Sequence, residues 1–353
     1  MKIFTCNNCS ELLYFENSTC LHCNHTVGFD VVQFDLLALE NQNNGYSPVD
    51  NNNTIVRFCT NAVHGTCNWL IPVDQLSPFC PACALNRTIP DLSTIDNQHK
   101  WKRIEIAKHR LVYSLMRLGL PIKAKRNVDD MEGIAFDFMG DVSINEKVMT
   151  GHDNGVITLN INEADESERT RHKLDLGEKY RTLLGHFRHE IGHYYWEVLI
   201  KDSSHLEKFR HLFGDEQRAY GVALETYYTT ATPANWNDHF ISPYATSHAW
   251  EDWAESWAHY MHMMDTLETA WSFGIGIQRP GIVTSAAADP YSTQDFSQIA
   301  NSWFPLTFAV NSLNRSMGHA DFYPFIIAPT VVEKLQFIHD VCRVWKAGAL
   351  KQM

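Results

Sequence analysis

The chain has 353 residues, of which 44% are hydrophobic and 20% are charged, a composition that predicts a folded protein with a large core. Its net charge of −12 argues against a nucleic-acid partner, because contacts to phosphates need basic surfaces. No apolar run reaches the length of about 18 residues that a membrane-spanning helix requires, so we expect no membrane partner.

Eight of the nine cysteines lie within the first 83 residues, and the N-terminus lacks the apolar stretch of a signal peptide. We therefore expect a cytoplasmic protein, and in a reducing compartment such clustering indicates metal ligands rather than disulfides. Two pairs with Cys-x2-Cys spacing predict a closed structural zinc site, since each short turn directs both thiolates at one tetrahedral ion. The ligands of this first site are Cys6, Cys9, Cys20 and Cys23.

A second structural zinc site is predicted after an asparagine-rich stretch, residues 40–53, which we interpret as a loop or linker. Its first two cysteines are separated by seven residues, an irregular spacing, so His64 is an alternative to one of the four thiolates. The ligands of this second site are Cys59, Cys67, Cys80 and Cys83. Both sites stabilise a zinc-ribbon module over residues 1–95, and neither is expected to do chemistry.

From Trp101 the sequence predicts a helix that ends at Gly119 and Pro121. Its apolar positions recur at helical spacing: Ile104, Ala107, Leu111, Leu115 and Leu118. Residues 100–126 contain nine Lys or Arg and a single acidic residue, Glu105. This basic stretch is either an anion-binding patch or a solvated helix face that docks on the acidic ribbon module. We favour the second interpretation.

Residues 133–139 and 155–161 alternate in the pattern of β-strands and predict two neighbouring strands. Beyond about residue 178 the chain is predicted to be mainly helical, with packing helices within residues 296–317 and 329–345. The expected fold is therefore α+β. A mainly helical domain with a small sheet, residues 96–353, follows the ribbon module.

A largely buried helix is predicted over residues 181–200, and it contains His189-Glu190-Ile191-Gly192-His193. Residues i and i+4 share one helix face, so both imidazoles can bind one metal ion. Glu190 can then contact a water on that ion without binding the metal itself. Two alternatives remain open: His186 and His189 share the ion, or the histidines are only hydrogen-bonded.

The third ligand of a catalytic zinc is expected in a second helix, because such a site has three protein ligands and one open position. A tryptophan stripe predicts that this helix packs into the core: Trp250, Trp253 and Trp257. Glu251 and Glu255 lie on an adjoining face, where a buried carboxylate is costly unless it is paired or bound to metal. We expect Glu251 to bind the zinc and Glu255 to orient a ligating histidine. The reverse assignment and a purely salt-bridged pair are the alternatives.

The chain resembles gluzincin peptidases, including the catalytic domain of anthrax lethal factor, in one pattern: His189-Glu190-x-x-His193 followed by Glu251-x-x-Ala254-Glu255. Over nearly its whole length it also resembles a bacterial family of zinc-binding metallopeptidases with an N-terminal zinc ribbon. This second resemblance is carried by six segments: CNWLIP (67–72), FCPACALNRTIPDLS (79–93), GVITLNINEAD (155–165), HFRHEIGHYYW (186–196), EDWAESWAHYMH (251–262) and SMGHADFYPFIIAP (316–329). It implies a zincin-like fold and a catalytic zinc, and it implies no particular substrate.

The residues and the resemblance together predict a zinc-dependent peptidase with one catalytic and two structural zinc ions and a protein or peptide substrate. Glu190 would act as general base. The resemblance implies that Tyr244, seven residues before Glu251, stabilises the oxyanion, with His248 or Tyr260 as less favoured alternatives. Three other functions are considered: a DNA-associated SprT-like protease, a hydrolase of another amide, and a non-catalytic zinc-stabilised protein-binding module. The acidic ribbon argues against the first and the intact Glu190 against the last.

Overall fold

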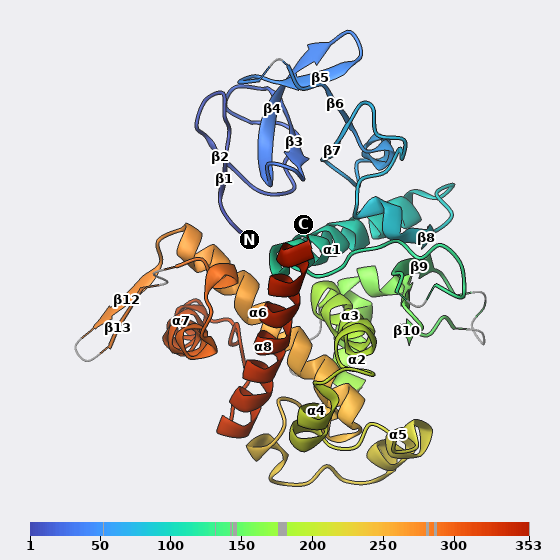
Figure 1. Ribbon diagram of the computed structural model, residues 1–353, viewed down its shortest axis with the longest axis vertical. Helices are drawn as coiled ribbons and strands as arrows, with labels where there is room; N and C mark the ends of the chain where they lie inside the picture. The colour runs from blue at the N-terminus through green and yellow to red at the C-terminus, as the bar shows by residue number, and fades with distance from the viewer. Residues whose placement is uncertain are drawn as a thin grey trace. The chain divides into compact units, whose positions relative to one another are not determined.

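The computed structural model describes residues 1–51, 53–130, 132–141, 143, 147–175, 182–279, 282–285 and 288–352. The chain divides into two compact units. The first comprises Met1–Val112, Ile122–Thr150 and Val156–Glu168, and the second comprises Tyr113–Pro121, Gly151–Gly155 and Arg169–Met353. Small sheets are prominent in the first unit and helices in the second (Figure 1), so the fold is α+β, as predicted.

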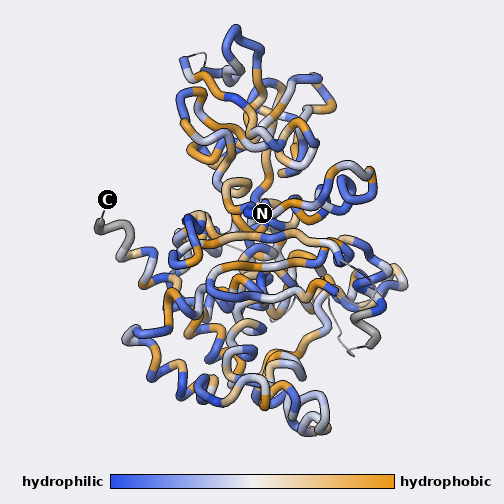
Figure 2. The backbone as a smooth tube through the Cα atoms, turned by 90° about the vertical axis from the view of Figure 1, so that its right-hand side faces the viewer, coloured by the Kyte–Doolittle hydropathy of each residue, from blue (hydrophilic) through white to orange (hydrophobic). Residues whose placement is uncertain are grey.

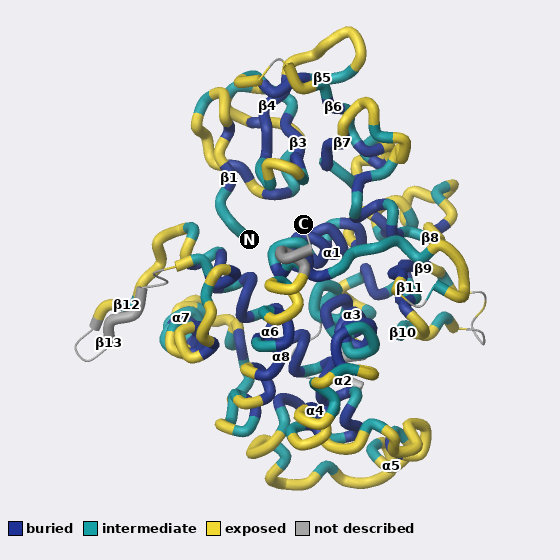
Figure 3. Tube along the Cα trace, viewed as in Figure 1, coloured by how far each residue is buried: buried dark blue, intermediate teal, exposed yellow. Residues whose placement is uncertain are grey.

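Five strands of the first unit close into a small barrel. They are β3 (Thr26–Asp30), β4 (Asp35–Gln42), β5 (Gly45–Pro48), β6 (Val56–Phe58) and β7 (Trp69–Pro72), and a two-stranded ribbon of β1 (Phe4–Thr5) and β2 (Leu12–Leu13) precedes them. The parallel pairing of Phe29 with Trp69 joins the first barrel strand to the last. An apolar cluster is buried between the strands, and β3 and part of β4 are dark blue in Figure 3. The cluster comprises Leu37, Leu39, Val56 and Leu70.

The prediction of a loop or linker at residues 40–53 is wrong for residues 40–48. β4 continues to Gln42 and β5 returns from Gly45, so a hairpin with a two-residue turn occupies this stretch. Gly45 has φ +146°, and a Cβ at this position would lie 2.5 Å from the Val56 carbonyl oxygen, so the turn requires glycine. The polar composition concealed the strands, because the end of β4 is exposed and needs no apolar residues.

Helix α1 (Ile95–Leu118) begins before the predicted start at Trp101 and ends as predicted at Gly119, whose φ is +70°. All five apolar positions predicted for its core face are buried: Ile104, Ala107, Leu111, Leu115 and Leu118. In the first unit, β9 (Ala135–Met139) pairs in parallel with both β8 (Asn86–Thr88) and β11 (Val156–Asn160). The two strands predicted from β patterning are therefore neighbours.

Several basic residues of α1 in the first unit contact acidic side chains. Lys108 and Glu105 are both fully buried and lie 2.9 Å apart. Arg110 donates to the carboxylate of Glu16 at 2.6 Å. This second contact ties α1 to the cysteine-rich N-terminal segment. The buried Lys108 does not fit the favoured interpretation of a solvated helix face, and docking on the ribbon stays a prediction.

Helices make up most of the second unit. They are α3 (Leu183–Leu199), α4 (Leu206–Phe213), α5 (Tyr220–Thr229), α6 (Ala249–Ser272), α7 (Phe296–Ser316) and α8 (Pro329–Gln352), with α2 (Glu166–Asp175) before them and a hairpin of β12 (Gly276–Arg279) and β13 (Ile282–Ser285) after α6. Helix α6 contacts α3, α4, α7 and α8 (Figure 1), and α7 and α8 are the two packing helices predicted from the sequence. Along the chain, hydrophobic and hydrophilic residues alternate over short intervals (Figure 2), as expected of elements with one face in a core. None of the helices in the described part of the chain combines the length and the apolar character that crossing a bilayer requires.

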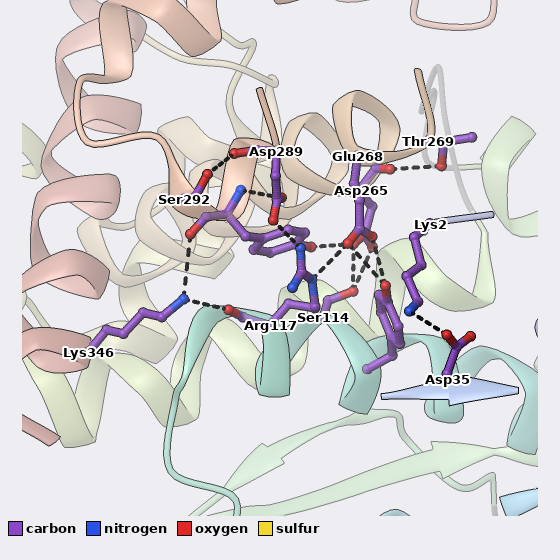
Figure 4. A network of polar contacts seen from close by, with 12 residues as sticks. Lys2, Asp35, Ser114, Arg117, Asp265, Glu268, Thr269, Asp289, Ser292 and Lys346 are labelled. Carbon is purple, nitrogen blue, oxygen red and sulfur yellow. Dashed lines mark hydrogen bonds and ion pairs between the residues drawn. The ribbon is translucent and has the colours of Figure 1, made fainter. Parts of the chain in front are cut away.

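Two buried carboxylates near the C-terminal end of α6 are each satisfied by several donors (Figure 4). Asp265 accepts from the Ser114 hydroxyl at 2.8 and 2.7 Å and from the Tyr291 hydroxyl at 2.5 Å. Glu268 accepts from the Arg117 guanidinium at 2.7 Å. Because an unpaired buried charge is strongly destabilising, this network holds the end of α1 and the end of α6 together within the second unit.

Candidate metal centres

Helix α3 places two histidines on one face, as the motif predicts. Thr182 starts the helix by accepting a hydrogen bond from the Gly185 backbone N–H at 2.9 Å. His189 and His193 follow one turn apart, and their ring centroids are 4.9 Å from each other. His193 is buried, and only 12% of the His189 side chain is exposed. The pair therefore faces a protected space within the second unit.

Helix α6 brings Glu251 to the same place. Its carboxylate oxygen Oε2 lies 3.0 Å from His189 Nε2 and 3.6 Å from His193 Nε2, and the residue is 1% exposed. One donor atom from each of these three residues lies within 4.8 Å of the others. The structure thus brings together the three residues that the sequence analysis proposes as ligands of a catalytic zinc.

The hydrogen bonding of this cluster supports a metal site. Within the described residues, Glu251 Oε2, which faces the Nε2 atoms of both histidines, is buried and makes no hydrogen bond, although such atoms are almost always satisfied in folded proteins. Burial alone would raise the pKa of Glu251, but the adjacent imidazoles of His193 and His189 lower it well below its usual value. An ionised carboxylate that faces two imidazole nitrogens is a donor set that suits zinc.

Glu255 lies behind His189 and contacts its other ring nitrogen. The distance from His189 Nδ1 to Glu255 Oε1 is 2.7 Å. With the Nδ1 proton donated to Glu255, the lone pair of Nε2 is left to face Glu251. Burial opposes ionisation of Glu255, yet the hydrogen bond from His189 lowers its pKa. This geometry corresponds to the favoured assignment, in which Glu251 binds metal and Glu255 orients a histidine, and not to the reverse.

Glu190 is buried next to the histidine pair. Its Oε1 lies 3.2 Å from His186 Nε2. Burial opposes its ionisation, but the hydrogen bond from His186 and the electrostatic effect of the neighbouring histidines lower its pKa, so the residue is a carboxylate at neutral pH. The alternative in which His186 and His189 share an ion is not what the structure shows, because His186 faces Glu190 instead.

Of the three residues considered for the oxyanion, Tyr244 has a ring contact with His189. It lies in a short 3-10 turn, Tyr244–Thr246, and its ring centroid is 6.0 Å from that of His189. His248 instead caps α6, where its Nδ1 accepts from the Trp250 backbone N–H at 3.1 Å. Tyr260 is fully buried and its hydroxyl lies 3.0 Å from His339 Nδ1. Both alternatives are thus engaged in other contacts.

Tyr220, the first residue of α5, was not predicted from the sequence as part of the site. Its hydroxyl donates to Glu251 Oε1 at 2.6 Å. Trp250 was expected only to pack in the core, yet its ring centroid lies 4.0 Å from that of His193. No sequence signal marks Tyr220, because it stands 31 residues before Glu251 in a segment without a motif.

The cysteines of the first unit form two groups of four whose sulfur atoms could each hold one ion: Cys6, Cys9, Cys20 and Cys23, and Cys59, Cys67, Cys80 and Cys83. The sulfur–sulfur distances within them include 3.7 Å for Cys6–Cys23, 3.6 Å for Cys9–Cys20 and 3.8 Å for Cys67–Cys80. Such groups of close thiol sulfurs fit tetrahedral zinc.

The histidine that approaches the second cysteine group is not the one that was predicted. His64, the alternative ligand, packs against Trp101 with ring centroids 5.5 Å apart and does not join the group. His109 of α1 does approach it, with Nε2 3.7 Å from Cys83 Sγ and Nδ1 2.7 Å from the Glu105 carbonyl oxygen. His109 was missed because it lies 26 residues after Cys83, outside any ligand spacing.

Comparison with known proteins places these features in a family. Residues 97–341 match the family described as "Putative zinc-binding metallo-peptidase", and residues 3–94 match a zinc-ribbon domain. Uncharacterized proteins of Mycobacterium bovis and Mycobacterium tuberculosis are 42% identical over 347 residues, which cover 97% of this chain and 95% of theirs. No solved structure matches the chain. The predicted domain boundary at residue 95 stays a prediction.

Proposed function

Because the chain belongs to this family of zinc-binding metallopeptidases, we propose that it hydrolyses peptide bonds in a protein or peptide substrate. One observation carries the proposal. His189, His193 and Glu251 converge on a common point, and the ionised carboxylate of Glu190 stands beside them on α3. A non-catalytic structural site has no use for a carboxylate in that position.

Each residue of the site has a role in this proposal. Zinc held by His189, His193 and Glu251 would supply a water of lowered pKa and polarise the scissile carbonyl. Glu190 accepts a proton from the attacking water and delivers it to the departing amine nitrogen. Tyr244 donates a hydrogen bond to the carbonyl oxygen as negative charge develops on it.

The scaffold supports these roles. Glu255 holds the His189 ring in place through the 2.7 Å contact to Nδ1. The 3.2 Å contact from His186 keeps the Glu190 carboxylate ionised, and therefore able to accept a proton. Burial of Tyr244 raises the pKa of its hydroxyl, so the group remains a neutral hydrogen-bond donor over the physiological pH range.

The proposal is tested with a peptide library incubated with zinc-loaded protein and read by mass spectrometry. Wild type should cleave a defined set of peptides. Glu190→Gln should retain the zinc and lose at least about 100-fold in rate, since general-base catalysis contributes about 10²–10⁴-fold. Glu225→Gln makes the same chemical change at an exposed residue of α5 and should cleave like wild type.

Two results would reject the proposal. Cleavage by Glu190→Gln at the wild-type rate would show that another residue or a contaminant acts as the base. No cleavage by fully zinc-loaded wild type would favour the non-catalytic binding module. A gel-shift assay at physiological salt, run on the same protein, tests the DNA-associated alternative.

A further inference from the structure

We propose that Tyr220 is a positioning residue that holds one oxygen of Glu251, so that the carboxylate offers only its other oxygen to the metal. This inference rests on the proposed metal site. The two oxygens of Glu251 have different surroundings: Oε1 accepts the Tyr220 hydroxyl at 2.6 Å, and Oε2 faces His189 Nε2 at 3.0 Å. The orphaned oxygen described above is the second one.

The Tyr220 ring is held in place by its neighbours on the start of α6. Its centroid lies 5.3 Å from the His248 ring and 5.7 Å from the Trp250 ring, and both contacts are edge-to-face. His248 is itself fixed as the cap of α6. The tyrosine therefore approaches Glu251 from α5 along a direction set by packing.

The hydrogen bond from Tyr220 to Glu251 belongs to a strong class. An O–H donor to a carboxylate forms a short, charge-assisted hydrogen bond, and 2.6 Å is within the range for such bonds. Glu251 is 1% exposed, so no bulk water competes for Oε1.

The Tyr220 contact limits the number of donor atoms that Glu251 can offer to the metal. A carboxylate can bind zinc through one oxygen or both, and a second oxygen would fill the position that a catalytic zinc leaves open for water. With Oε1 engaged by Tyr220, Glu251 contributes one donor and the open position is preserved. Tyr220 thus acts on the metal only through Glu251.

The test compares Tyr220→Phe with Tyr228→Phe in the full-length protein. Both variants remove one hydroxyl from a tyrosine of α5, and Tyr228 is 62% exposed. The ion of the His189–His193–Glu251 site is removed with a mild chelator until about two zinc ions per chain remain. That site is then titrated with zinc against a competing chelator and, separately, with cobalt.

Tyr220→Phe should bind zinc about 10–100-fold more weakly than wild type, as expected when a residue that orients a metal ligand is lost. The visible d–d bands of its cobalt form should differ from those of wild type, because a second carboxylate oxygen in place of water changes the donor set of the ion. Tyr228→Phe should match wild type in both measurements. Thermal unfolding of the zinc-loaded proteins checks that both variants are folded.

Zinc affinity and a cobalt spectrum for Tyr220→Phe that match those of wild type and Tyr228→Phe would overturn this inference and leave the proposed function intact. If wild type takes up no ion at this site, the proposed function fails, and the inference fails with it. The two failures are distinguishable, because metal uptake by wild type is measured first and requires no substrate.

Discussion

Gly192 lies so close to Ala254 that a Cβ added to the glycine would be 3.2 Å from the Ala254 Cα. The same added atom would lie 3.2 Å from the Cβ of Trp257. The Gly192 carbonyl also accepts a hydrogen bond from the Trp253 indole at 2.8 Å. Helices α3 and α6 therefore pack backbone against backbone beside His193, and this contact sets how far Glu251 stands from the two histidines.

Gly192→Ala should destabilise the protein by about 1–3 kcal/mol, because overpacking at a rigid backbone contact outweighs the gain of about 1 kcal/mol in helix propensity. Urea unfolding of the zinc-loaded protein measures the change. Gly348→Ala, in α8 with no atom within 4 Å of the added Cβ, is the matched control and should be neutral or slightly stabilising. Equal stability of the two variants would show that α3 and α6 separate at no cost.

The number of zinc ions per chain should be about three in wild type, and His193→Ala should lower it to about two. Plasma mass spectrometry on protein washed free of loosely bound metal measures this count. His211→Ala removes an exposed histidine of α4 and should leave the count unchanged. A count of two in both wild type and His193→Ala would mean that the His189–His193–Glu251 cluster holds no ion.

Lys334→Met should lower the free energy of unfolding by about 3–5 kcal/mol, because it leaves the buried Asp252 carboxylate without its cation. Lys334 Nζ lies 2.6 Å from Asp252 Oδ2, and the two side chains are 6% and 0% exposed. Lys208→Met breaks an exposed pair with Asp340, separated by 4.0 Å, and should cost no more than about 1 kcal/mol. Denaturant unfolding at pH 7 compares them, and similar losses would contradict the argument from burial.

Acid should destabilise the protein through His259. Burial lowers the pKa of His259 to about 4, whereas its usual value is about 6.5. Between these values the unfolded chain takes up a proton that the folded one refuses, so stability is intact above about pH 6.5 and declines as the pH falls towards 4. This one group should account for a loss of about 2 kcal/mol between pH 7 and pH 5.

The measurement for this prediction is urea unfolding of wild type and His259→Gln at both pH values. The glutamine variant is less stable at pH 7, because it loses the 2.7 Å contact between His259 Nδ1 and the Tyr323 hydroxyl. Its further loss on acidification should be smaller than that of wild type by about 2 kcal/mol. If the free energy of unfolding falls equally in the two proteins between pH 7 and pH 5, His259 is protonated in the folded state.

Much of the candidate site could be predicted because its chemistry depends on local spacing. The i, i+4 histidines follow from the helical repeat of α3. The Trp253–Trp257 stripe indicates that α6 is buried, and Glu251 lies on the adjoining face. Likewise, short Cys-x2-Cys turns brought the cysteines together in groups of four. Whether these residues bind metal in the assigned roles stays a prediction.

The parts that could not be predicted depend on contacts between distant segments. The β3–β7 barrel was missed because its strands are short and the asparagines of the β4–β5 hairpin suggest a loop. Tyr220 and His109 were missed for a related reason. Each contacts its partner from a different segment, and only the tertiary fold brings α5 to Glu251 or α1 to Cys83.

The barrel of the first unit has a consequence for how this module can meet other proteins. Because β3 pairs with β7, the strands form a ring, and a partner cannot join it by adding a strand. Recognition would instead use exposed side chains outside the barrel strands, such as Leu21, Val32 and Leu76. The closed ring also offers neighbouring chains no template for edge-to-edge aggregation of these strands.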